Sequence, residues 1–396
     1  MKVSAKVIID PKKLSEDENE IDIFLKENSE NPFMLLSFIK NAMNEAIHSV
    51  RVPVFIIVRV DGEIVGVASF VFKEYFGIRS AEFLTEFWTS PNFITKDNFA
   101  PIVIRTILRL IPKTLNSKFM FLYMNRDSEN LSILKRICAS KNIPFFDDSN
   151  QSLDYGVIPV NCSWDDFKKT RGRHFWKELN YVENKLNRKG IWKVTVFENY
   201  DESDETIYKK ILDVEKLSWK ERHRQLRGET VDTSILWFLY SSSTTKDNSA
   251  ILRRKIWFLE LNNQAVAYSM VFQYKGIAYI AKTSFVEEYR KLGLGKFIIE
   301  VAIKNLFDKK EVHKIDFMTY VPLVGFWKAD RLERVRLRLG SRVIVNFAFA
   351  MSIPRLVVAH LYDINKLSDL ALTAQSQLNR AKRKKTFHLP RFLRGE

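Results

Sequence analysis

The chain has 396 residues, of which 46% are hydrophobic, and it includes 30 Phe and 8 Trp. This length exceeds one ordinary hydrophobic core, so we expect two domains of the α/β or α+β class. Only 13 Gly and 11 Pro argue against a fibrous or low-complexity chain. Two cysteines, Cys138 and Cys162, exclude a disulfide framework, and no Cys or His shows zinc spacing. We therefore expect a metal-free protein of the reducing cytoplasm.

Membrane insertion is not predicted by the apolar pattern. The N-terminus turns acidic, at SEDENE, where a signal peptide would need an apolar stretch. The most apolar run, Val343 to Tyr362, is interrupted by Asn346, Pro354 and Arg355. That run is better interpreted as a buried strand followed by a helix, so we expect no transmembrane segment.

The formal net charge of +16 is unevenly distributed. Residues 168–193 hold nine Lys or Arg and two Glu, a net charge of +7. Residues 381–396 reach +5, whereas residues 1–30 carry five Lys and eight Asp or Glu, a net charge of −3. Clustered positive charge attracts ligand phosphates, nucleic acid, anionic lipid or an anionic glycan. The alternative is a solvated helix face and a frayed tail.

Two hairpins about two hundred residues apart indicate a diverged internal duplication. Residues 54–72 are typical of strand, Asp61-Gly62 turn, strand, and residues 256–274 repeat the design around Asn262-Asn263. Amphipathic hairpins can resemble one another by chance, but two copies of one α/β module fit the length. With the turns aligned, Val60 falls on Leu261, Val65 on Val266 and Gly66 on Ala267.

A helical segment lies between the hairpins. Ser163 and Asp166 have the capping-box spacing of a helix start, and Gly190 indicates the helix end. Phe175, Leu179, Val182 and Leu186 form one apolar helical face. Interleaved with this face are the basic residues Arg171, Arg173, Lys177, Lys185, Arg188 and Lys189.

The pattern then changes to a strand, Trp192 to Phe197, and a second helix from about Glu205 to Lys220. The apolar side of that helix holds Ile207, Ile211, Val214 and Leu217. The Asp/Ser/Asn-rich stretch DDSNQS, just before residue 153, predicts a domain boundary. We therefore expect a first domain at 1–155, a second at 156–362 with the basic helical segment 163–190, and a basic C-terminal helix or tail at 363–396.

The segment after the second hairpin carries the strongest chemical signal. Ile277 to Phe285 is typical of a strand, a short loop follows, and Phe297 to Phe307 is typical of an amphipathic helix. A strand leading through a Gly-bearing turn into a helix N-terminus forms an anion pocket, because unpaired N–H groups and the helix dipole face the ligand. Gly293 and Gly295 let the backbone approach a pyrophosphate, and Arg290 offers a planar donor fork.

The run Arg290-Lys-Leu-Gly293-Leu-Gly295 resembles the acyl-CoA pyrophosphate signature of GNAT-type N-acetyltransferases, Arg/Gln-x-x-Gly-x-Gly/Ala. Its context is similar too, with a hairpin and strand before it, a helix after it, and a further strand expected from Ile315 to Tyr320. The resemblance implies two GNAT-like domains, each a mixed sheet flanked by helices. It also implies acetyl-CoA or another acyl-CoA as co-substrate.

The wider layout resembles tandem-GNAT acyltransferases of the BioF2-like or CelD-like branch, which is related to the FemAB peptidyltransferases. This resemblance covers roughly residues 50–350 and rests on RGRHFWKELNYVENKL, Ser218-Trp219-Lys220 and Phe326-Trp327-Lys328. The branch often has a less orthodox pyrophosphate loop, whereas this chain keeps both glycines, which favours CoA over a purely tRNA-dependent donor. The first copy has no Gly between Gly77 and Gly156, so we expect it to shape the acceptor cleft or to be structural.

The resemblance also implies site residues. In GNAT enzymes backbone N–H groups of the strand before the loop polarise the thioester carbonyl, which indicates Ala281, Lys282 and Thr283. That strand holds no Glu to act as a base, and we interpret Glu260, Glu287 and Glu288 as surface charges. The expected catalytic residues are Tyr279 and Tyr320, as proton donors to the thiolate. The expected acceptor-binding residues are Trp219, Lys220 and Lys328. The expected cofactor-binding residues are Lys282, Thr283, Arg290, Lys291, Leu292, Gly293, Leu294, Gly295 and Lys296.

Three function classes stay open. The favoured one is an acyl-CoA-dependent N-acyltransferase that transfers an acetyl or other acyl group to an amine on a polar or anionic acceptor, such as an amino sugar or glycan precursor. The second is a FemAB-like transferase that uses aminoacyl-tRNA, with the basic helix contacting phosphates. The third is a non-catalytic GNAT-fold binder of nucleic acid or of a membrane surface, with Arg380 to Lys385 (RAKRKK) as its contact.

Overall fold

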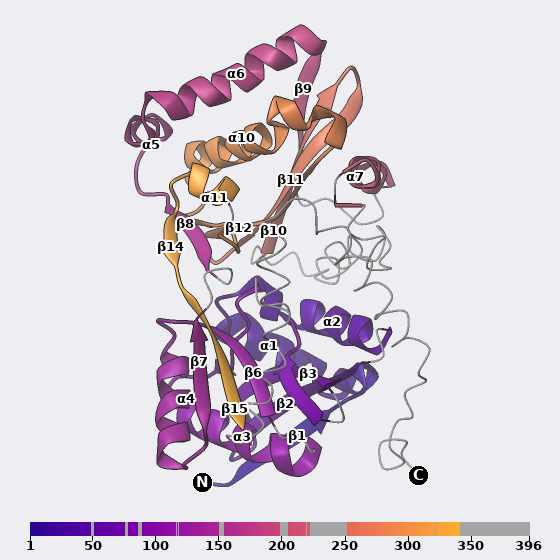
Figure 1. The fold of residues 1–396 in the computed structure, drawn as a ribbon. Helices are drawn as coiled ribbons and strands as arrows, with labels where there is room; N and C mark the ends of the chain where they lie inside the picture. Colours follow the sequence, from indigo (N-terminus) through magenta and orange to yellow (C-terminus); the bar gives the residue numbers. More distant parts are fainter. Residues whose placement is uncertain are drawn as a thin grey trace.

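The protein is built from two α/β units, each with its own sheet, as seen in the computed structural model in Figure 1. The structure describes residues 1–48, 51–75, 78–85, 89–115, 117, 119–149, 154–198, 205–218, 220–221, 252–320 and 322–340. The apolar run 343–362, the basic tail and Trp219 lie outside these residues. No helix in the described ranges combines the length and apolarity needed to cross a lipid bilayer.

The first sheet has the strand order β1-β2-β3-β4-β6-β15-β7, with β5 also paired to β3. Helices cover both of its faces, so its central strands are buried along nearly their whole length. The strands are β1 (Val3–Ile8), β2 (Val52–Val60), β3 (Glu63–Tyr75), β4 (Ile78–Phe83), β5 (Ile94–Thr95), β6 (Phe119–Asn125), β7 (Phe145–Ser149) and β15 (Arg334–Gly340). The helices of this first unit are η1 (Pro11–Asp17), α1 (Glu18–Asn28), η2 (Pro32–Met34), α2 (Leu36–His48), α3 (Ala100–Leu115) and α4 (Glu129–Ser140).

The second sheet has the strand order β14-β8-β13-β12-β11-β10-β9. Helix α7 packs against β11 and β12, and α10 packs against β10, β11 and β12. The strands are β8 (Tyr155–Pro159), β9 (Trp192–Glu198), β10 (Leu252–Leu261), β11 (Gln264–Tyr274), β12 (Ile277–Phe285), β13 (Lys314–Asp316) and β14 (Asp330–Leu332). The helices of this second unit are α5 (Trp164–Arg171), α6 (Arg173–Lys189), α7 (Glu205–Lys216), η5 (Glu287–Leu292), α10 (Leu294–Lys309) and α11 (Pro322–Phe326).

The two sheets repeat one design. Read from β9, the second order is β9-β10-β11-β12-β13-β8-β14, which matches the first order position by position. The parallel pair also recurs, since β4 runs parallel to β6 and β12 runs parallel to β13. The tandem α/β fold expected from the sequence is therefore confirmed.

The two hairpins share an irregularity as well as a shape. In β3 a β-bulge leaves Val65 between the pairs Val58 with Gly66 and Arg59 with Ile64. In β11 the same bulge leaves Val266 between the pairs of Ala267 and Ala265 with β10. Alignment of the turns had placed Val65 on Val266. Since a bulge is a designed local feature of a strand pair, its repetition supports duplication rather than chance likeness.

The two units exchange one strand each. Strand β8, which follows the first unit in sequence, lies between β13 and β14 of the second sheet. Strand β15, which follows the second unit, lies between β6 and β7 of the first sheet, and Figure 1 shows it crossing from one unit to the other. Residues 334–340 therefore belong to the first sheet, although they fall inside the range 156–362 expected for the second domain. Each sheet therefore contains one strand that follows the other unit in the sequence.

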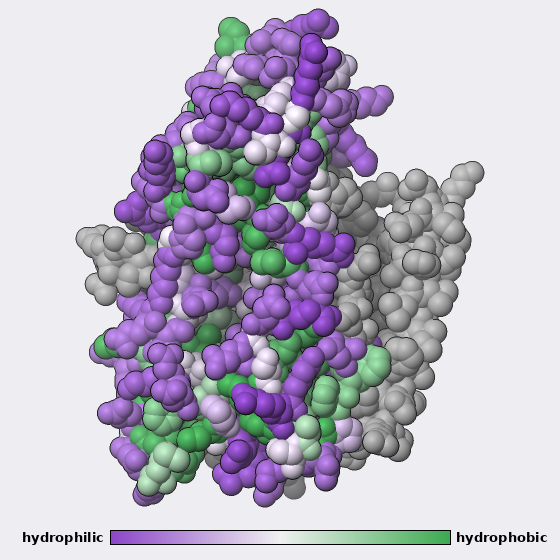
Figure 2. All heavy atoms as spheres, turned by 90° about the vertical axis from the view of Figure 1, so that its left-hand side faces the viewer, coloured by the Kyte–Doolittle hydropathy of each residue, from purple (hydrophilic) through white to green (hydrophobic). Residues whose placement is uncertain are grey.

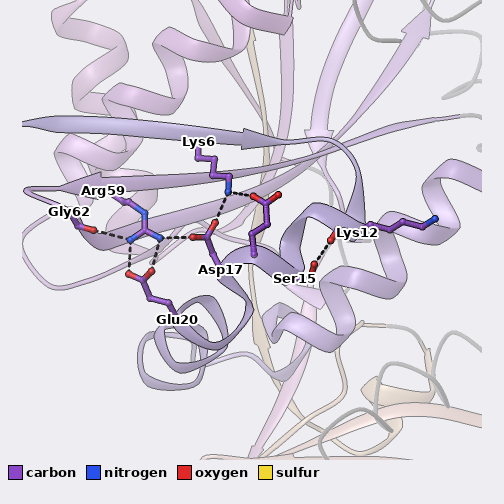
Figure 3. Close-up of polar contacts among 8 residues, drawn as sticks. Lys6, Lys12, Ser15, Asp17, Glu20, Arg59 and Gly62 are labelled. Atoms are coloured by element: carbon purple, nitrogen blue, oxygen red, sulfur yellow. Dashed lines mark hydrogen bonds and ion pairs between the residues drawn. The ribbon is translucent and has the colours of Figure 1, made fainter. Parts of the chain in front are cut away.

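Much of the acidic N-terminal charge is used within the fold. Arg59 on β2 binds the Glu20 carboxylate through both terminal nitrogens at 2.6 Å, and Asp17 lies 3.3 Å from the same guanidinium (Figure 3). Lys6 on β1 donates to Asp17 and to Glu16 at 2.8 Å. These ion pairs fasten η1 and α1 to the hairpin, so the negative segment 1–30 serves the first unit's own fold.

The structure confirms some predicted elements and corrects others. Ser163 accepts the N–H of Asp166 at 3.1 Å, as the capping box predicts, and the predicted apolar face of α6 is buried. The single helix predicted over 163–190 is wrong, because Gly172 has a φ of 83° and divides it into α5 and α6. The second helix ends at Lys216, and Leu217, which was expected on its buried apolar side, is 51% exposed. The strand expected to run from Ile315 to Tyr320 covers only Lys314–Asp316.

Candidate active site

Strand β12 separates from its parallel neighbour after three residues. The pairing with β13 covers Ile277 to Tyr279 and stops there, and a β-bulge on the β11 side then leaves Ala281 unpaired. Residues Ala281, Lys282 and Thr283 are half-buried within a strand that is otherwise largely buried. A strand edge without a neighbour leaves backbone N–H and carbonyl groups for a ligand. The structure thus opens at the three residues predicted to face the thioester.

Beyond the opening, β12 leads into the predicted glycine turn. Residues Glu287–Leu292 form a 3₁₀ helix, Gly293 adopts a left-handed conformation with φ 81°, and α10 begins at Leu294. Gly295 therefore lies in the first helical turn, earlier than the helix start predicted at Phe297. The N–H groups of Lys296 and Phe297 donate to the Gly293 carbonyl. The N–H groups of Leu294 and Gly295 are those of the first turn left for an anion.

Both glycines of the turn are needed for different reasons. At Gly293 a side chain would strain a left-handed backbone, and its Cβ would come within 3.2 Å of Val182 on α6. At Gly295 a Cβ would come within 3.3 Å of the Phe285 ring on β12. The side chain of Arg290 is 73% exposed, with Glu287 at 3.1 Å as its partner. A weakly held, exposed guanidinium is available to bind phosphate.

The basic helix α6 lies along the outer side of α10, as Figure 1 shows, and it also contacts η5, which leads into the turn. Lys185 on α6 donates to the Lys291 carbonyl at 3.0 Å, and Glu178 pairs with Lys296. Lys296 also lies 4.1 Å from the centre of the Phe326 ring. Helix α6, which the sequence singled out for its charge and its apolar face, therefore holds the glycine turn in place.

Two other sequence features meet at the start of α6. Phe175 stacks on Phe326 with ring centres 4.6 Å apart and contacts Trp327 edge-on at 5.2 Å. Arg171, at the end of α5, donates to the Lys328 carbonyl at 2.9 Å. The sequences RGRHFW and Phe326-Trp327-Lys328 therefore pack against each other, through aromatic rings and through one hydrogen bond. Of the six basic residues noted on this segment, Arg171 and Lys185 hold the fold together, whereas Arg173, Lys177, Arg188 and Lys189 are exposed.

A buried carboxylate lies behind the opening, on the α7 side of the sheet. Glu215 is fully buried, accepts a 2.5 Å hydrogen bond from the Tyr268 hydroxyl, and lies 3.7 Å from the Lys282 amine. This charge is tolerated because a cation and a hydroxyl face it. Glu215 was not among the residues predicted from the sequence, although its position four residues after Ile211 places it on the apolar side of α7.

Lys220 also reaches this region. Its amine donates to the backbone carbonyl of Thr283, within the half-buried part of β12. Burial lowers the pKa of Lys220 to about 8. On the opposite face of the strand, the hydroxyls of Ser269 and Thr283 lie 3.2 Å apart. Lysine, threonine and serine groups therefore surround the strand segment at which the sheet opens.

The second unit, which contains this site, is similar to a known protein family. The family model described as an acetyltransferase (GNAT) domain matches residues 173–328, which span the turn, β12 and both flanking helices. Residues 173–328, referred to as the GNAT domain, therefore resemble a GNAT acetyltransferase domain. The chain as a whole repeats the sheet of this domain, so it has a tandem GNAT-like fold. A search of curated proteins gives no significant sequence match.

Solved structures share the fold of nearly the whole chain. The crystal structure of FemX is 11% identical, with 85% of this chain and 97% of FemX covered at a TM-score of 0.51. L-PGS from Bacillus licheniformis is 10% identical, with 87% and 97% covered at a TM-score of 0.53. A conserved protein of unknown function from Bacteroides thetaiotaomicron is 8% identical, with 85% and 100% covered, also at 0.53. At such identities the likeness shows the tandem fold alone.

The predicted proton donors of the GNAT domain lie in different surroundings. Tyr279 is the last residue of β12 that pairs with β13, and its hydroxyl donates at 3.0 Å to the Glu30 carbonyl of the first unit. Its ring also packs edge-on against Phe33 at 5.8 Å, and burial raises its pKa far above the usual range. Tyr320 is half-buried beyond β13, with the Arg331 guanidinium 5.2 Å from its ring. Tyr279 therefore serves the contact between the units.

The remaining predicted residues of the GNAT domain are dispersed. Lys328 is exposed, and Trp219 lies outside the described residues. Glu260 is not a surface charge, since it is 5% exposed and pairs with Lys210 at 2.6 Å. Within the described ranges, no three His, Cys, Asp or Glu side chains are arranged to hold a metal ion.

The first unit lacks a counterpart of the turn. In the GNAT domain eight residues, 286–293, connect β12 to α10, whereas sixteen residues, 84–99, connect the equivalent strand β4 to α3 and include β5. The longer connection has no glycine. The equivalent helix start is therefore reached without a glycine turn.

Proposed function

We propose that the chain is an acyl-CoA-dependent N-acyltransferase, which transfers an acetyl or other acyl group to an amine on a polar or anionic acceptor such as an amino sugar or glycan precursor. The observation that carries this proposal is the opening between β12 and β13, which ends in the Arg290–Gly295 turn at the N-terminus of α10. An extended thioester ligand fits an unpaired strand edge, and its pyrophosphate fits the turn.

The residues of the turn suit a CoA pyrophosphate. The N-terminal N–H groups of α10 supply hydrogen bonds, and the exposed Arg290 guanidinium supplies a bidentate donor. Lys291 and Lys296 add positive charge beside it. The half-buried backbone of Ala281 to Thr283 would hold the acyl carbonyl, where developing negative charge needs N–H donors.

Transfer joins the acceptor nitrogen to the carbonyl carbon and breaks the carbon–sulfur bond, with the proton passing to the leaving thiolate. We assign the thiolate donor to Tyr320, because the Tyr279 hydroxyl is already engaged with the first unit. Lys328 and Lys220 remain the proposed acceptor-side cations. The first unit packs against the GNAT domain, since Phe33 and Phe38 contact Phe272 edge-on at 5.9 and 5.8 Å.

A second candidate is FemAB-like transfer from aminoacyl-tRNA. The observation that favours it is the exposed basic face of α6, with Arg173, Lys177, Arg188 and Lys189. Figure 2 shows hydrophilic side chains covering the upper part of the molecule on the side where α5 and α6 lie. A non-catalytic binding role would depend on the RAKRKK tail, which lies outside the described residues.

Thermal denaturation with a panel of ligands tests the donor. Acetyl-CoA or a longer acyl-CoA, at about one hundred times its dissociation constant, should add about 2.7 kcal/mol to the free energy of unfolding. Transfer RNA at matched phosphate concentration serves as the comparison. No shift in melting temperature with any acyl-CoA at millimolar concentration would contradict the proposal. A shift with aminoacyl-tRNA alone would favour the FemAB-like alternative.

Neutralising the exposed face of α6 separates the acceptor from the donor. The triple variant Arg173→Gln, Lys177→Gln, Arg188→Gln should leave acyl-CoA affinity unchanged and raise the KM for an anionic acceptor, because these side chains lie away from the turn. The matched control is Lys12→Gln, Lys13→Gln, Lys141→Gln, which removes the same charge from exposed sites of the first unit. If tRNA is the ligand, the variant should instead flatten the salt dependence of binding by up to about 0.9 logarithmic units per lost phosphate contact.

A further inference from the structure

A lysine amine lies against the strand segment at which we place the acyl carbonyl. Lys220 follows α7 in the chain, and its Nζ donates to the carbonyl oxygen of Thr283. Thr283 lies beyond the last β12–β13 pair, at Tyr279, and so borders the opening. The Lys220 amine is therefore at the reacting end of the proposed donor channel.

This amine differs from two other lysines of the second unit, Lys282 and Lys255, which are paired with carboxylates. Lys282 lies 3.7 Å from the Glu215 carboxylate, and Lys255, which is 2% exposed, pairs with Glu311 at 2.8 Å. Lys220 has no carboxylate within ion-pair distance among the residues that the structure describes, and burial alone lowers its pKa from 10.5 to about 8. Charged groups on the adjoining elements, Glu215 and Lys282, face each other. At pH 7 an amine with this pKa is neutral about a tenth of the time, and the neutral form is the nucleophile.

We propose that Lys220 is an internal acyl acceptor: when no external amine occupies the site, a bound acyl-CoA acylates its Nζ. This inference rests on the proposed function and adds a modification site to it. The neutral nitrogen attacks the thioester carbonyl carbon, a carbon–nitrogen bond forms, and the carbon–sulfur bond breaks. The proton lost by the nitrogen goes to the thiolate, so the products are an Nε-acyl-lysine and free CoA.

Acylation of Lys220 would limit the enzyme's own activity. The amide keeps one N–H for the Thr283 carbonyl but removes the positive charge and fills the opening with an acyl group. The modified protein should therefore turn over more slowly when acceptor is added later. A cell with abundant acyl-CoA and little acceptor would accumulate the modified form.

The chemistry predicts a large selectivity for this lysine. At pH 7 a group with a pKa of about 8 is neutral about a hundred times more often than one with a pKa above 10. The acylation rate of Lys220 should rise with pH and level off above about 8. An exposed lysine that keeps the ordinary pKa should react slowly at pH 7, and its rate should still be rising at pH 9.

The test incubates the full-length protein with acetyl-CoA alone at pH 7 and at pH 9, followed by intact mass measurement and peptide mapping. We expect one acetyl group per chain, at Lys220, formed about a hundred times faster at pH 7 than at a lysine of ordinary pKa. Lys220→Arg should abolish the rapid mass increase. Lys255→Arg, a buried and ion-paired control remote from the turn, should retain it.

Acetyl-CoA binding is measured on the same samples by thermal shift, so that two failures can be told apart. Stabilisation by acetyl-CoA without acetylation of Lys220, or with acetylation spread over exposed lysines at equal rates, overturns the internal acceptor and leaves the proposed function standing. Absence of both stabilisation and CoA release overturns the proposed function itself. Peptide mapping of the wild-type chain decides the question even if Lys220→Arg fails to fold.

Discussion

Leu337→Ala should lower the free energy of unfolding by about 2–5 kcal/mol and should loosen the first sheet rather than the second. Leu337 is 1% exposed on β15, where it lies between Leu122 of β6 and Asp147 of β7. Truncation leaves a cavity in the core that β15 shares with α3 and α4. Hydrogen exchange followed by mass spectrometry should show faster exchange in β6 and β7, although the substitution lies after the GNAT domain in the sequence.

Ile298→Ala is the matched control, because Ile298 is fully buried in the core of the second unit. It should cost a similar free energy but loosen the strands beneath α10. If Leu337→Ala leaves β6 and β7 protected while the second sheet exchanges faster, the strand exchange described here is contradicted. The exchange also implies that cutting the chain near residue 155 separates β15 from the first unit. Strands β6 and β7 then lose the strand that lies between them, and β15 loses both of its partners.

The double variant Gly293→Val, Gly295→Val should weaken acyl-CoA binding at least about a hundredfold, which corresponds to about 2.8 kcal/mol. Valine at position 293 is strained at a φ of 81°, and a side chain at position 295 meets Phe285. Both effects displace the turn from the position that presents its N–H groups to a phosphate. Isothermal titration with acetyl-CoA measures the loss.

These substitutions also strain the unliganded fold, so a second variant separates binding from folding. Arg290→Ala removes an exposed side chain and should leave the melting temperature unchanged, while binding weakens by roughly 1.5–3 kcal/mol for a lost charge-assisted hydrogen bond. Arg105→Ala, on the exposed side of α3 in the first unit, is the control and should have no effect on binding. Unchanged acyl-CoA affinity in both the Arg290 and the glycine variants would show that the turn does not bind the pyrophosphate.

Patterns within a few residues predicted much of the second unit. The turn at Asn262-Asn263, the cap at Ser163, the buried face from Phe175 to Leu186 and the Gly293 turn all follow from local spacing. The hairpin alignment even paired Val65 with Val266, the two bulged residues. Where the sequence predicted wrongly, as in the continuous helix through Gly172, a single backbone conformation overrode a helical pattern.

The sequence by itself determined the duplicated α/β design and the glycine turn at the start of α10, because periodicity and glycine placement are local properties of the chain. Only the tertiary structure decided that β8 and β15 change places, that Glu215 meets Tyr268 across 53 positions, and that Lys220 meets Thr283 across 63. A β-strand pattern predicts which side chains are buried but not which strand lies beside it. The type of a charged residue likewise does not predict its partner. Strand neighbours and ion-pair partners are both determined by packing between distant parts of the chain.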